Sequence, residues 1–267
     1  MATDRIAERF ARLREEGRTG LLPYVTAGFP DMEATLEVVP ALAEAGADIV
    51  ELGVPFSDPL ADGPTIQEAS FHALGNGVTL EGCLGLVERL RERGETVPLV
   101  PFSYYNPILH YGLETFARRA SECGADGVLV PDLPPDEAGP LRDACAPYGI
   151  HLIPLLAPTS TDARIRLACQ AASGFVYCVS LTGVTGARDS LPEGVFDFLA
   201  RVRRHTDLPL AVGFGVSKRE HVESIGAAAQ AAAVGSALIR VLQESPRDRL
   251  VEKAGRFVLE LRGVPVP

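Results

Sequence analysis

The sequence predicts an α/β fold, a (β/α)8 TIM barrel formed by a single domain that spans residues 1–267. From Leu21 onward, short β-branched or aliphatic runs alternate with longer segments of helical period, a pattern typical of βα units around a parallel sheet. The sequence EAGADIVEL (44–52) recurs as ECGADGVLV (122–130), which indicates a repeating architecture. No Ser-, Gly- or Pro-rich linker divides the chain. Eight units of this spacing fit a closed barrel of ordinary size.

The first predicted element is an N-terminal helix, in which Ile6, Phe10 and Leu13 recur at helical spacing. Eight predicted strands follow, at 21–27, 47–54, 97–104, 126–132, 151–157, 175–181, 208–215 and 231–237. The helical segments between them often end in a glycine, which can adopt the left-handed conformation that terminates a helix. An open doubly wound sheet is the alternative, but the chain has neither GxGxxG after the first strand nor GxxxxGK[ST].

Composition and charge argue against several classes of function. Charged residues make up 22% of the chain, and no apolar run approaches the roughly 20 residues that cross a bilayer. A net charge of −10 opposes contact with a nucleic-acid backbone. The N-terminus lacks a signal-peptide pattern, and the five cysteines include no CxxC pair. We therefore expect a cytoplasmic protein with reduced thiols and no nucleic-acid or membrane partner.

A carboxylate interrupts the second predicted strand. Glu51 lies among aliphatic residues near the carboxyl end of this run, where barrel enzymes hold catalytic groups. A buried, unpaired carboxylate is costly, so Glu51 must find a partner or keep a proton near neutral pH. A carboxyl group in either situation can act as a general acid or a general base. A salt-bridged glutamate at the barrel rim is the alternative.

The loop after Glu51 is stiffened by prolines and carries two further acids, Asp58 and Asp62. Two carboxylates in different environments can divide acid–base work, one moving protons and the other staying ionised to hold a donor. Spacing alone does not choose between Asp58 and Asp62 for the second role.

Glycine-rich turns follow the last three predicted strands, as GVTGAR (183–188), GFGVSK (213–218) and GS (235–236). Backbone N–H groups beside a helix N-terminus bind phosphate, and barrels often use the loops after strands seven and eight for this purpose. Tight βα turns are the alternative for any one of these glycines. Together they favour an anion site.

Seven stretches, in chain order, resemble the family of the tryptophan synthase α subunit across nearly the whole chain: PYVTAGFPD, ELGVPFSDPLADGPTIQ, YYNPI, VPDLPPDE, SLTGVTGAR, GFGVS and VGSA. The resemblance implies cleavage of indole-3-glycerol phosphate to indole and glyceraldehyde 3-phosphate, a retro-aldol reaction without a cofactor. It also implies a β subunit as partner, in an α2β2 heterotetramer. Of the two aspartates, it selects Asp62.

The resemblance also implies roles for individual residues. Glu51 would move the proton, Asp62 would hold the indole N–H, and Tyr177 would line the site beside Glu51. Thr185 would lie on a loop that closes over the substrate. The phosphate would be held by Gly186, Gly213, Gly215, Gly235 and Ser236. The ring pocket would draw on Tyr24, Tyr104, Leu129, Leu155 and Phe214, any one of which could instead be ordinary core.

The residue types available for catalysis agree with this reaction. Cleavage through a Schiff base needs a desolvated lysine on a strand, but the chain has only Lys218, past a strand, and Lys253, in the final helix. The five histidines are scattered, with no HxH or HExxH pattern for a metal. A carboxylate-driven cleavage remains.

A departure from the family before the eighth predicted strand and three rival functions stay open. Ala229 and Gln230 stand where the family commonly has Ala-Asp, which puts the entry to the eighth predicted strand in doubt. The rivals are a stand-alone lyase that releases indole, a phosphosugar isomerase on the same barrel, and a non-catalytic binding subunit.

Overall fold

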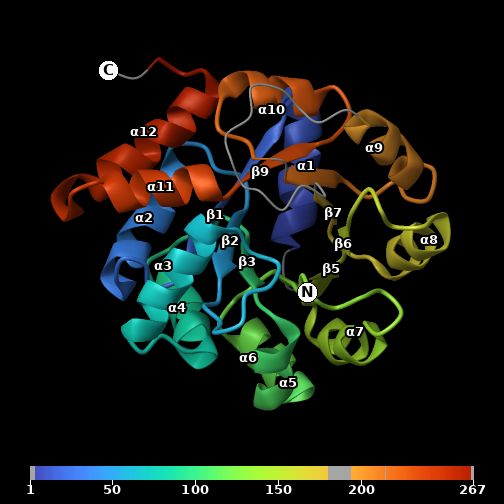
Figure 1. The fold of residues 1–267 in the computed structure, drawn as a ribbon, viewed down its shortest axis with the longest axis horizontal. Coiled ribbons are helices and arrows are strands. Elements are labelled where there is room, and N and C mark those ends of the chain that lie inside the picture. Colours follow the sequence, from blue (N-terminus) through green and yellow to red (C-terminus); the bar gives the residue numbers. More distant parts are fainter. Residues whose placement is uncertain (1–3, 180–193, 214, 266–267) are drawn as a thin grey trace.

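The computed structural model describes residues 4–179, 194–213 and 215–265, in which a ring of helices surrounds a barrel of parallel strands (Figure 1). The strands are β1 (Gly20–Thr26), β2 (Val50–Gly53), β3 (Leu99–Phe102), β4 (Gly127–Leu129), β5 (His151–Ile153), β6 (Leu155–Leu156), β7 (Val176–Val179), β8 (Leu210–Gly213) and β9 (Ala231–Val234). The α-helices are α1 (Arg5–Glu16), α2 (Met32–Glu44), α3 (Pro64–Gly75), α4 (Leu80–Glu92), α5 (Tyr105–Tyr111), α6 (Leu113–Glu122), α7 (Gly139–Cys145), α8 (Asp162–Ala171), α9 (Val195–Arg203), α10 (Arg219–Gly226), α11 (Ser236–Glu244) and α12 (Leu250–Arg262), with 3-10 turns η1 (Ala146–Tyr148) and η2 (Arg247–Arg249). No helix in the described part is long and apolar enough to cross a membrane.

The sheet closes through its fifth predicted strand. The strand order is β5-β4-β3-β2-β1-β9-β8-β7-β6, and the paired neighbours are parallel. β5 and β6 stand at opposite ends of this order, yet only Pro154 separates them in the chain. The chain itself therefore joins the two ends of the sheet, which confirms the predicted (β/α)8 barrel.

The run predicted as one strand at 151–157 is divided at Pro154, so eight predicted strands give nine among the described residues. Pro154 has no N–H to donate to a ladder, which limits proline to interruptions and edges of sheets. Its carbonyl oxygen accepts the N–H of Tyr177 at 3.0 Å. β5 pairs with β4 and β6 with β7, so the break lies where the two ends of the sheet meet.

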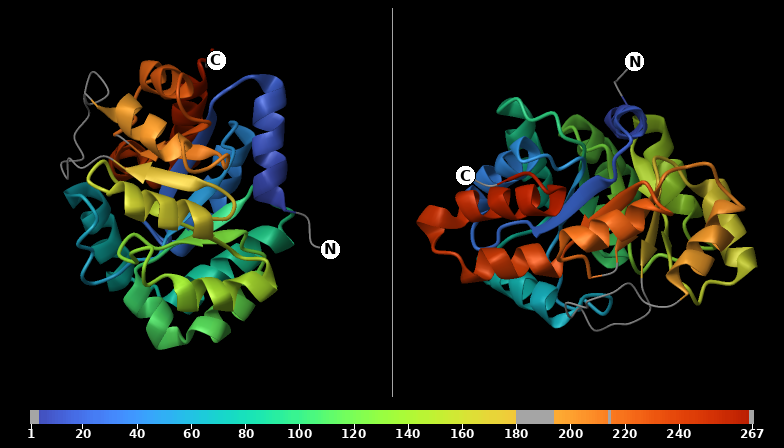
Figure 2. Two further views of the ribbon diagram at one scale, coloured as in Figure 1. Left: turned by 90° about the vertical axis from the view of Figure 1, so that its right-hand side faces the viewer. Right: turned by 90° about the horizontal axis from the view of Figure 1, so that it is seen from above.

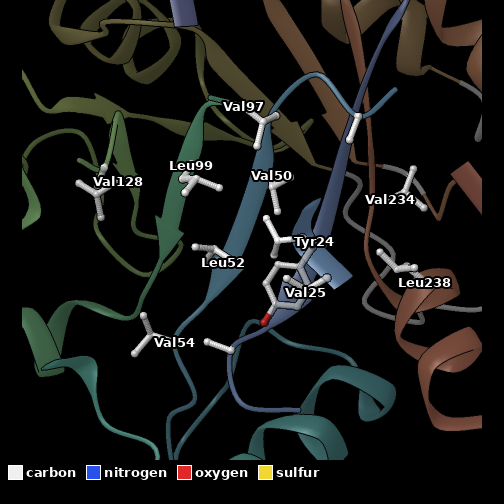
Figure 3. Close-up of a cluster of buried hydrophobic side chains, with 14 of the residues drawn as sticks. Tyr24, Val25, Val50, Leu52, Val54, Val97, Leu99, Val128, Val234 and Leu238 are labelled. Carbon is white, nitrogen blue, oxygen red and sulfur yellow. The ribbon is translucent and has the colours of Figure 1, made fainter. Parts of the chain in front are cut away.

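Successive strand residues face two hydrophobic clusters. On β2, Val50 and Leu52 belong to the outer cluster beneath the helices, part of which Figure 3 shows together with Leu99 of β3. Ile49 belongs to the inner cluster, inside the barrel. Because side chains alternate along a strand, Glu51 lies on the same inner face as Ile49.

Helix α1 covers the end of the barrel at which the strands begin (Figure 2). Its apolar residues Ile6, Phe10 and Leu13 are buried in the inner cluster. The ring of Phe10 lies 5.6 Å from that of Phe175, the residue before β7. The opposite end, where the strands finish, is free of this helix and carries the loops that hold the candidate site residues.

The repeated Gly-Ala-Asp sequence joins neighbouring strands at their starts. Asp48 and Asp126 are buried, and they precede β2 and β4. A carboxylate oxygen of Asp48 accepts the N–H of Leu21 at 2.9 Å, and one of Asp126 accepts the N–H of Leu99 at 2.8 Å. Arginines pair with both acids, as Arg18 does with Asp48 at 2.8 Å. Each buried charge is thus compensated, as burial requires.

Gln230 makes the corresponding connection before β9. Its Oε1 atom accepts the N–H of Leu210 at 2.9 Å and an N–H of Arg203 at 2.7 Å. Its backbone carbonyl accepts the N–H of Gly20, which starts β1, at 2.9 Å. An amide oxygen therefore replaces the expected carboxylate oxygen, and the departure at Ala229 and Gln230 leaves the strand entry intact.

Candidate active site

Glu51 lies at the inner face of the barrel, between Tyr24 of β1 and Val100 of β3 in the strand register. It is 1% exposed, and its Oε1 atom has no hydrogen-bond partner in the part of the chain that the structure describes. Burial raises the pKa of Glu51 to about 8, because desolvation disfavours the carboxylate. At neutral pH this side chain therefore holds a proton that it can donate.

The loop after β2 places the two candidate aspartates differently. Asp58 is exposed, and its carboxylate accepts the hydroxyl of Ser57 at 2.5 Å. Asp62 is half-buried, and desolvation raises its pKa to about 6, while the hydroxyl of Tyr104 acts to lower it. Of these two aspartates, Asp62 is the one in a partly desolvated position beside a tyrosine, and Asp58 faces solvent.

Tyr104 also fixes the backbone next to Asp62. Its hydroxyl oxygen accepts the N–H of Ala61 at 2.9 Å, and its ring lies 5.1 Å from that of Phe56, earlier in the same loop. On the other side, the amide of Gln67 in α3 donates to the carbonyl of Asp62 at 2.8 Å. These contacts hold the loop on both sides of the carboxylate.

Three aromatic rings form a row at the inner face of the barrel. Phe102 of β3 lies 5.6 Å from Tyr24 and 6.4 Å from Tyr177, edge-to-face in both cases. Burial raises the pKa of both tyrosines, so their hydroxyls keep their protons. Phe102 was missed among the ring residues predicted from the sequence. Its two-residue spacing from Val100 could have placed it on the inner face of its strand.

Two of the candidate phosphate-binding glycines lie against these tyrosines. A Cβ added to Gly213 would lie 2.7 Å from the hydroxyl oxygen of Tyr177, and one added to Gly235 would lie 3.8 Å from the Cβ of Tyr24. Gly235 precedes Ser236, the first residue of α11, and no side chain caps this helix. The first N–H groups of such a helix have no partner within it and suit an anion.

The remaining candidates have different surroundings. Gly215 is exposed with φ +66°, a conformation that favours glycine. Leu129 of β4 is buried in the inner cluster, and Leu155 of β6 is half-buried beside Tyr177 in the register. Three candidates lie outside the described residues: Thr185, Gly186 and Phe214.

Buried titratable groups gathered where the strands of a (β/α)8 barrel end define a barrel enzyme. The family model described as tryptophan synthase alpha chain matches residues 10–261 of the chain. The protein belongs to this family.

Individual relatives extend the match over nearly the whole chain. The tryptophan synthase alpha chain of Roseiflexus castenholzii is 56% identical over 259 residues, which cover 97% of this chain and 99% of the relative. A crystal structure of the alpha subunit from Legionella pneumophila is 34% identical with a TM-score of 0.90, covering 98% of both chains. A tryptophan synthase structure from Mycobacterium tuberculosis is 38% identical with a TM-score of 0.88, covering 96% of this chain and 98% of that chain. These matches do not favour the isomerase, stand-alone lyase or binding-subunit alternatives.

Proposed function

We propose that Glu51 and Asp62 carry out the α reaction of tryptophan synthase in this barrel. The protein is a lyase of tryptophan biosynthesis that cleaves indole-3-glycerol phosphate to indole and glyceraldehyde 3-phosphate. The observation that supports the roles of these residues best is the burial of Glu51 at the inner face of the barrel, with a pKa of about 8. A carboxyl group in that state can both give and take a proton near neutral pH.

In the first step, protonated Glu51 donates its proton to C3 of the indole ring. The ring then carries a positive charge that it shares with its nitrogen, so the substrate supplies the electron sink that other lyases obtain from a cofactor. The ionised carboxylate of Asp62 accepts the indole N–H and stabilises this charge in a partly desolvated site.

In the second step, the Glu51 carboxylate takes the proton of the hydroxyl group on the carbon attached to C3. That C–O bond becomes the carbonyl of glyceraldehyde 3-phosphate, and the carbon–carbon bond breaks. Its electron pair returns to the ring, which leaves as indole. Glu51 is protonated again, as it was at the start, and Tyr177 lines the site beside it.

The other residues bind and enclose the substrate in this proposal. The phosphate is held by Gly186, Gly213, Gly215, Gly235 and Ser236. The ring pocket is formed by Tyr24, Tyr104, Leu129, Leu155 and Phe214, with Phe102 added from the structure. Thr185 closes the site and excludes water, which strengthens the electrostatic interactions inside.

Indole release by the purified chain tests the catalytic assignment. Glu51→Gln removes the proton carrier, so we expect kcat to fall by about 100-fold or more, while the affinity for glycerol 3-phosphate stays within a few-fold. Asp58→Asn is the matched control, because Asp58 is exposed and outside the proposed chemistry. Full activity in Glu51→Gln, or loss of activity only in Asp58→Asn, would show that the wrong carboxylate has been chosen.

Membership of the family implies a tryptophan synthase β subunit as partner, and we propose an α2β2 heterotetramer. Leu60 is 94% exposed in the loop that Tyr104 holds, and Leu109 of α5 is 52% exposed a few residues beyond Tyr104. This apolar pair at the carboxyl end of the barrel suits an interface. Leu60→Asp should weaken assembly with a β subunit in analytical ultracentrifugation, whereas Phe196→Asp, at an exposed position of α9, should not. The cytoplasmic location and the single domain over residues 1–267 stay predictions.

A further inference from the structure

Residues 59–62 form a tight turn that ends on the second candidate carboxylate. The backbone N–H of Asp62 donates to the carbonyl of Pro59 at 3.0 Å, which is the hydrogen bond of a β-turn. Leu60 in the middle of this turn is 94% exposed, whereas Asp62 is half-buried. The turn projects from the rim of the barrel, so packing at Leu60 does not fix it. Other side chains must therefore determine where Asp62 lies.

Gln67, in the first turn of α3, reaches back to this β-turn. Its Nε2 atom donates to the carbonyl of Asp62 at 2.8 Å and, over a longer distance of 3.4 Å, to the carbonyl of Pro59. These carbonyls belong to the last and the first residue of the turn. A side-chain amide nitrogen carries two N–H groups, so it can serve both acceptors. Gln67 therefore bridges the two ends of the turn that presents Asp62.

The start of α3 is itself fixed to the barrel. The backbone N–H of Gln67 donates to the carbonyl of Gly63 at 3.0 Å, within the helix. The neighbouring Ile66 has its Cδ1 atom 3.5 Å from the position of a Cβ on Gly235, just before α11. α3 also packs against α11 and β1. The amide of Gln67 is thus carried by a helix turn whose place is set by packing, and it passes this fixed position to the exposed turn.

We propose that Gln67 is a positioning residue of the lyase reaction, which holds the backbone of Asp62 so that its carboxylate meets the indole N–H. This inference rests on the proposed role of Asp62. Gln67 binds the carbonyl of Asp62, whereas Tyr104 binds the N–H of the preceding Ala61. The backbone is thereby held before and after the Cα atom of Asp62. A displacement of about 1 Å at such a group can cost on the order of 100-fold in rate.

Two variants remove the N–H donors of Gln67. Gln67→Met keeps the length of the side chain, and Gln67→Glu keeps its shape but directs acceptor oxygens at two carbonyls. We expect kcat for indole-3-glycerol phosphate to fall by about tenfold in Gln67→Met and by more in Gln67→Glu, with KM within about threefold, because the phosphate site is untouched. Gln170→Met, at an exposed position of α8, is the matched control and should keep both constants. Urea unfolding of each variant verifies that it is folded.

Ligand binding tests the position of the carboxylate without any chemistry. Indole and benzofuran have nearly the same shape, but benzofuran has an oxygen in place of the N–H. In calorimetry the wild-type chain should prefer indole by about tenfold or more, because Asp62 accepts this N–H. Gln67→Met should lose most of this preference and keep its affinity for glycerol 3-phosphate.

An unchanged preference for indole in Gln67→Met and Gln67→Glu overturns the inference, as does an undiminished kcat in both variants. A wild-type chain that binds indole and benzofuran equally would instead overturn the proposed role of Asp62. The failure of the inference is therefore distinguishable from the failure of the proposed function.

Discussion

The hydroxyl oxygen of Tyr104 accepts the backbone N–H of Ala61 at 2.9 Å, which ties the loop after β2 to the segment that follows β3. Ala61 immediately precedes Asp62, so the place of the second carboxylate depends on a residue that is distant in the chain. A loop held in this way presents its carboxylate in one position before substrate arrives. Catalysis gains from such pre-organised geometry because the cost of ordering is met during folding.

Tyr104→Phe should therefore reduce activity more than stability. The N–H of Ala61 loses its acceptor and Asp62 loses a neighbouring hydroxyl, so we expect kcat/KM for indole-3-glycerol phosphate to fall by about tenfold or more. The loop lies at the rim of the barrel, and the change in unfolding free energy should stay near 1 kcal/mol, about that of one hydrogen bond. Steady-state kinetics and urea unfolding measure the two effects. A variant that loses stability but keeps its kcat/KM would assign Tyr104 a structural role only.

The pH dependence of kcat/KM should report the ionisation of both Glu51 and Asp62. In the proposed mechanism Glu51 begins with a proton, and its pKa is about 8, so kcat/KM should fall as the pH rises past that value. Asp62 must be ionised and has a pKa of about 6, so kcat/KM should also fall as the pH drops below it. The expected profile is a bell with its maximum near pH 7. Asp62→Asn should lose the acid limb together with most of the rate, and a wild-type profile that is flat from pH 6 to 9 would contradict the assignment.

Burial of Glu51 also makes the stability of the folded protein depend on pH. Below pH 4.5, the ordinary pKa of a glutamate side chain in an unfolded chain, Glu51 is protonated in both the folded and the unfolded state. Above that pH the unfolded chain releases the proton while the folded protein keeps it, so the favourable contribution is lost as the pH rises to about 8. A shift of this size corresponds to about 5 kcal/mol, an upper limit.

Glu51→Gln removes this ionisation, so the variant should gain stability relative to wild type as the pH rises from 4.5 to 8. Denaturant unfolding at several pH values measures the difference. Glu68→Gln, at an exposed position on α3, is the control and should show no such trend. Equal pH dependence in Glu51→Gln and wild type would mean that Glu51 ionises freely in the folded protein.

The sequence was sufficient to predict the barrel and a carboxylate at Glu51 within a buried strand, because both depend on local patterns: alternating strands and helices, and an acidic residue within an apolar run. It could not rank Asp58 against Asp62 by spacing, since the difference comes from Tyr104, which meets the loop only after folding. Pro154 was visible in the sequence, but its effect depends on where the sheet closes. The unpartnered hydroxyl of Thr26 likewise becomes evident only from three-dimensional packing.

Gln230 should be required for stability rather than for catalysis. In Gln230→Ala the buried N–H of Leu210 and the guanidinium of Arg203 both lose an acceptor, at a cost of about 1–3 kcal/mol. Gln230→Glu keeps an acceptor oxygen facing Arg203 and should retain most of the stability. Urea unfolding at neutral pH compares the two variants. If the two variants have the same unfolding free energy, the hydrogen bonds of the Gln230 side chain contribute little to stability.

Gly235→Ala separates anion binding from folding. The added Cβ would have its nearest neighbour, the Cδ1 atom of Ile66, at 3.5 Å, an ordinary contact, and φ at this position is −105°, which other residues also adopt. The fold should therefore accept alanine. A phosphate bound at the start of α11 needs close approach to backbone N–H groups, and a methyl group there would obstruct it.

We therefore expect Gly235→Ala to bind glycerol 3-phosphate about tenfold more weakly, or about 1.4 kcal/mol, in calorimetry, with an unchanged unfolding free energy. Gly85→Ala is the matched control, because Gly85 lies within α4 and an added Cβ meets no atom within 4 Å. Alanine is the better helix former, so this control should gain roughly 0.5–1 kcal/mol of stability and keep its affinity. Undiminished affinity in Gly235→Ala would exclude the start of α11 from the phosphate site. A loss of stability in this variant would show that the folded structure itself requires glycine at this position.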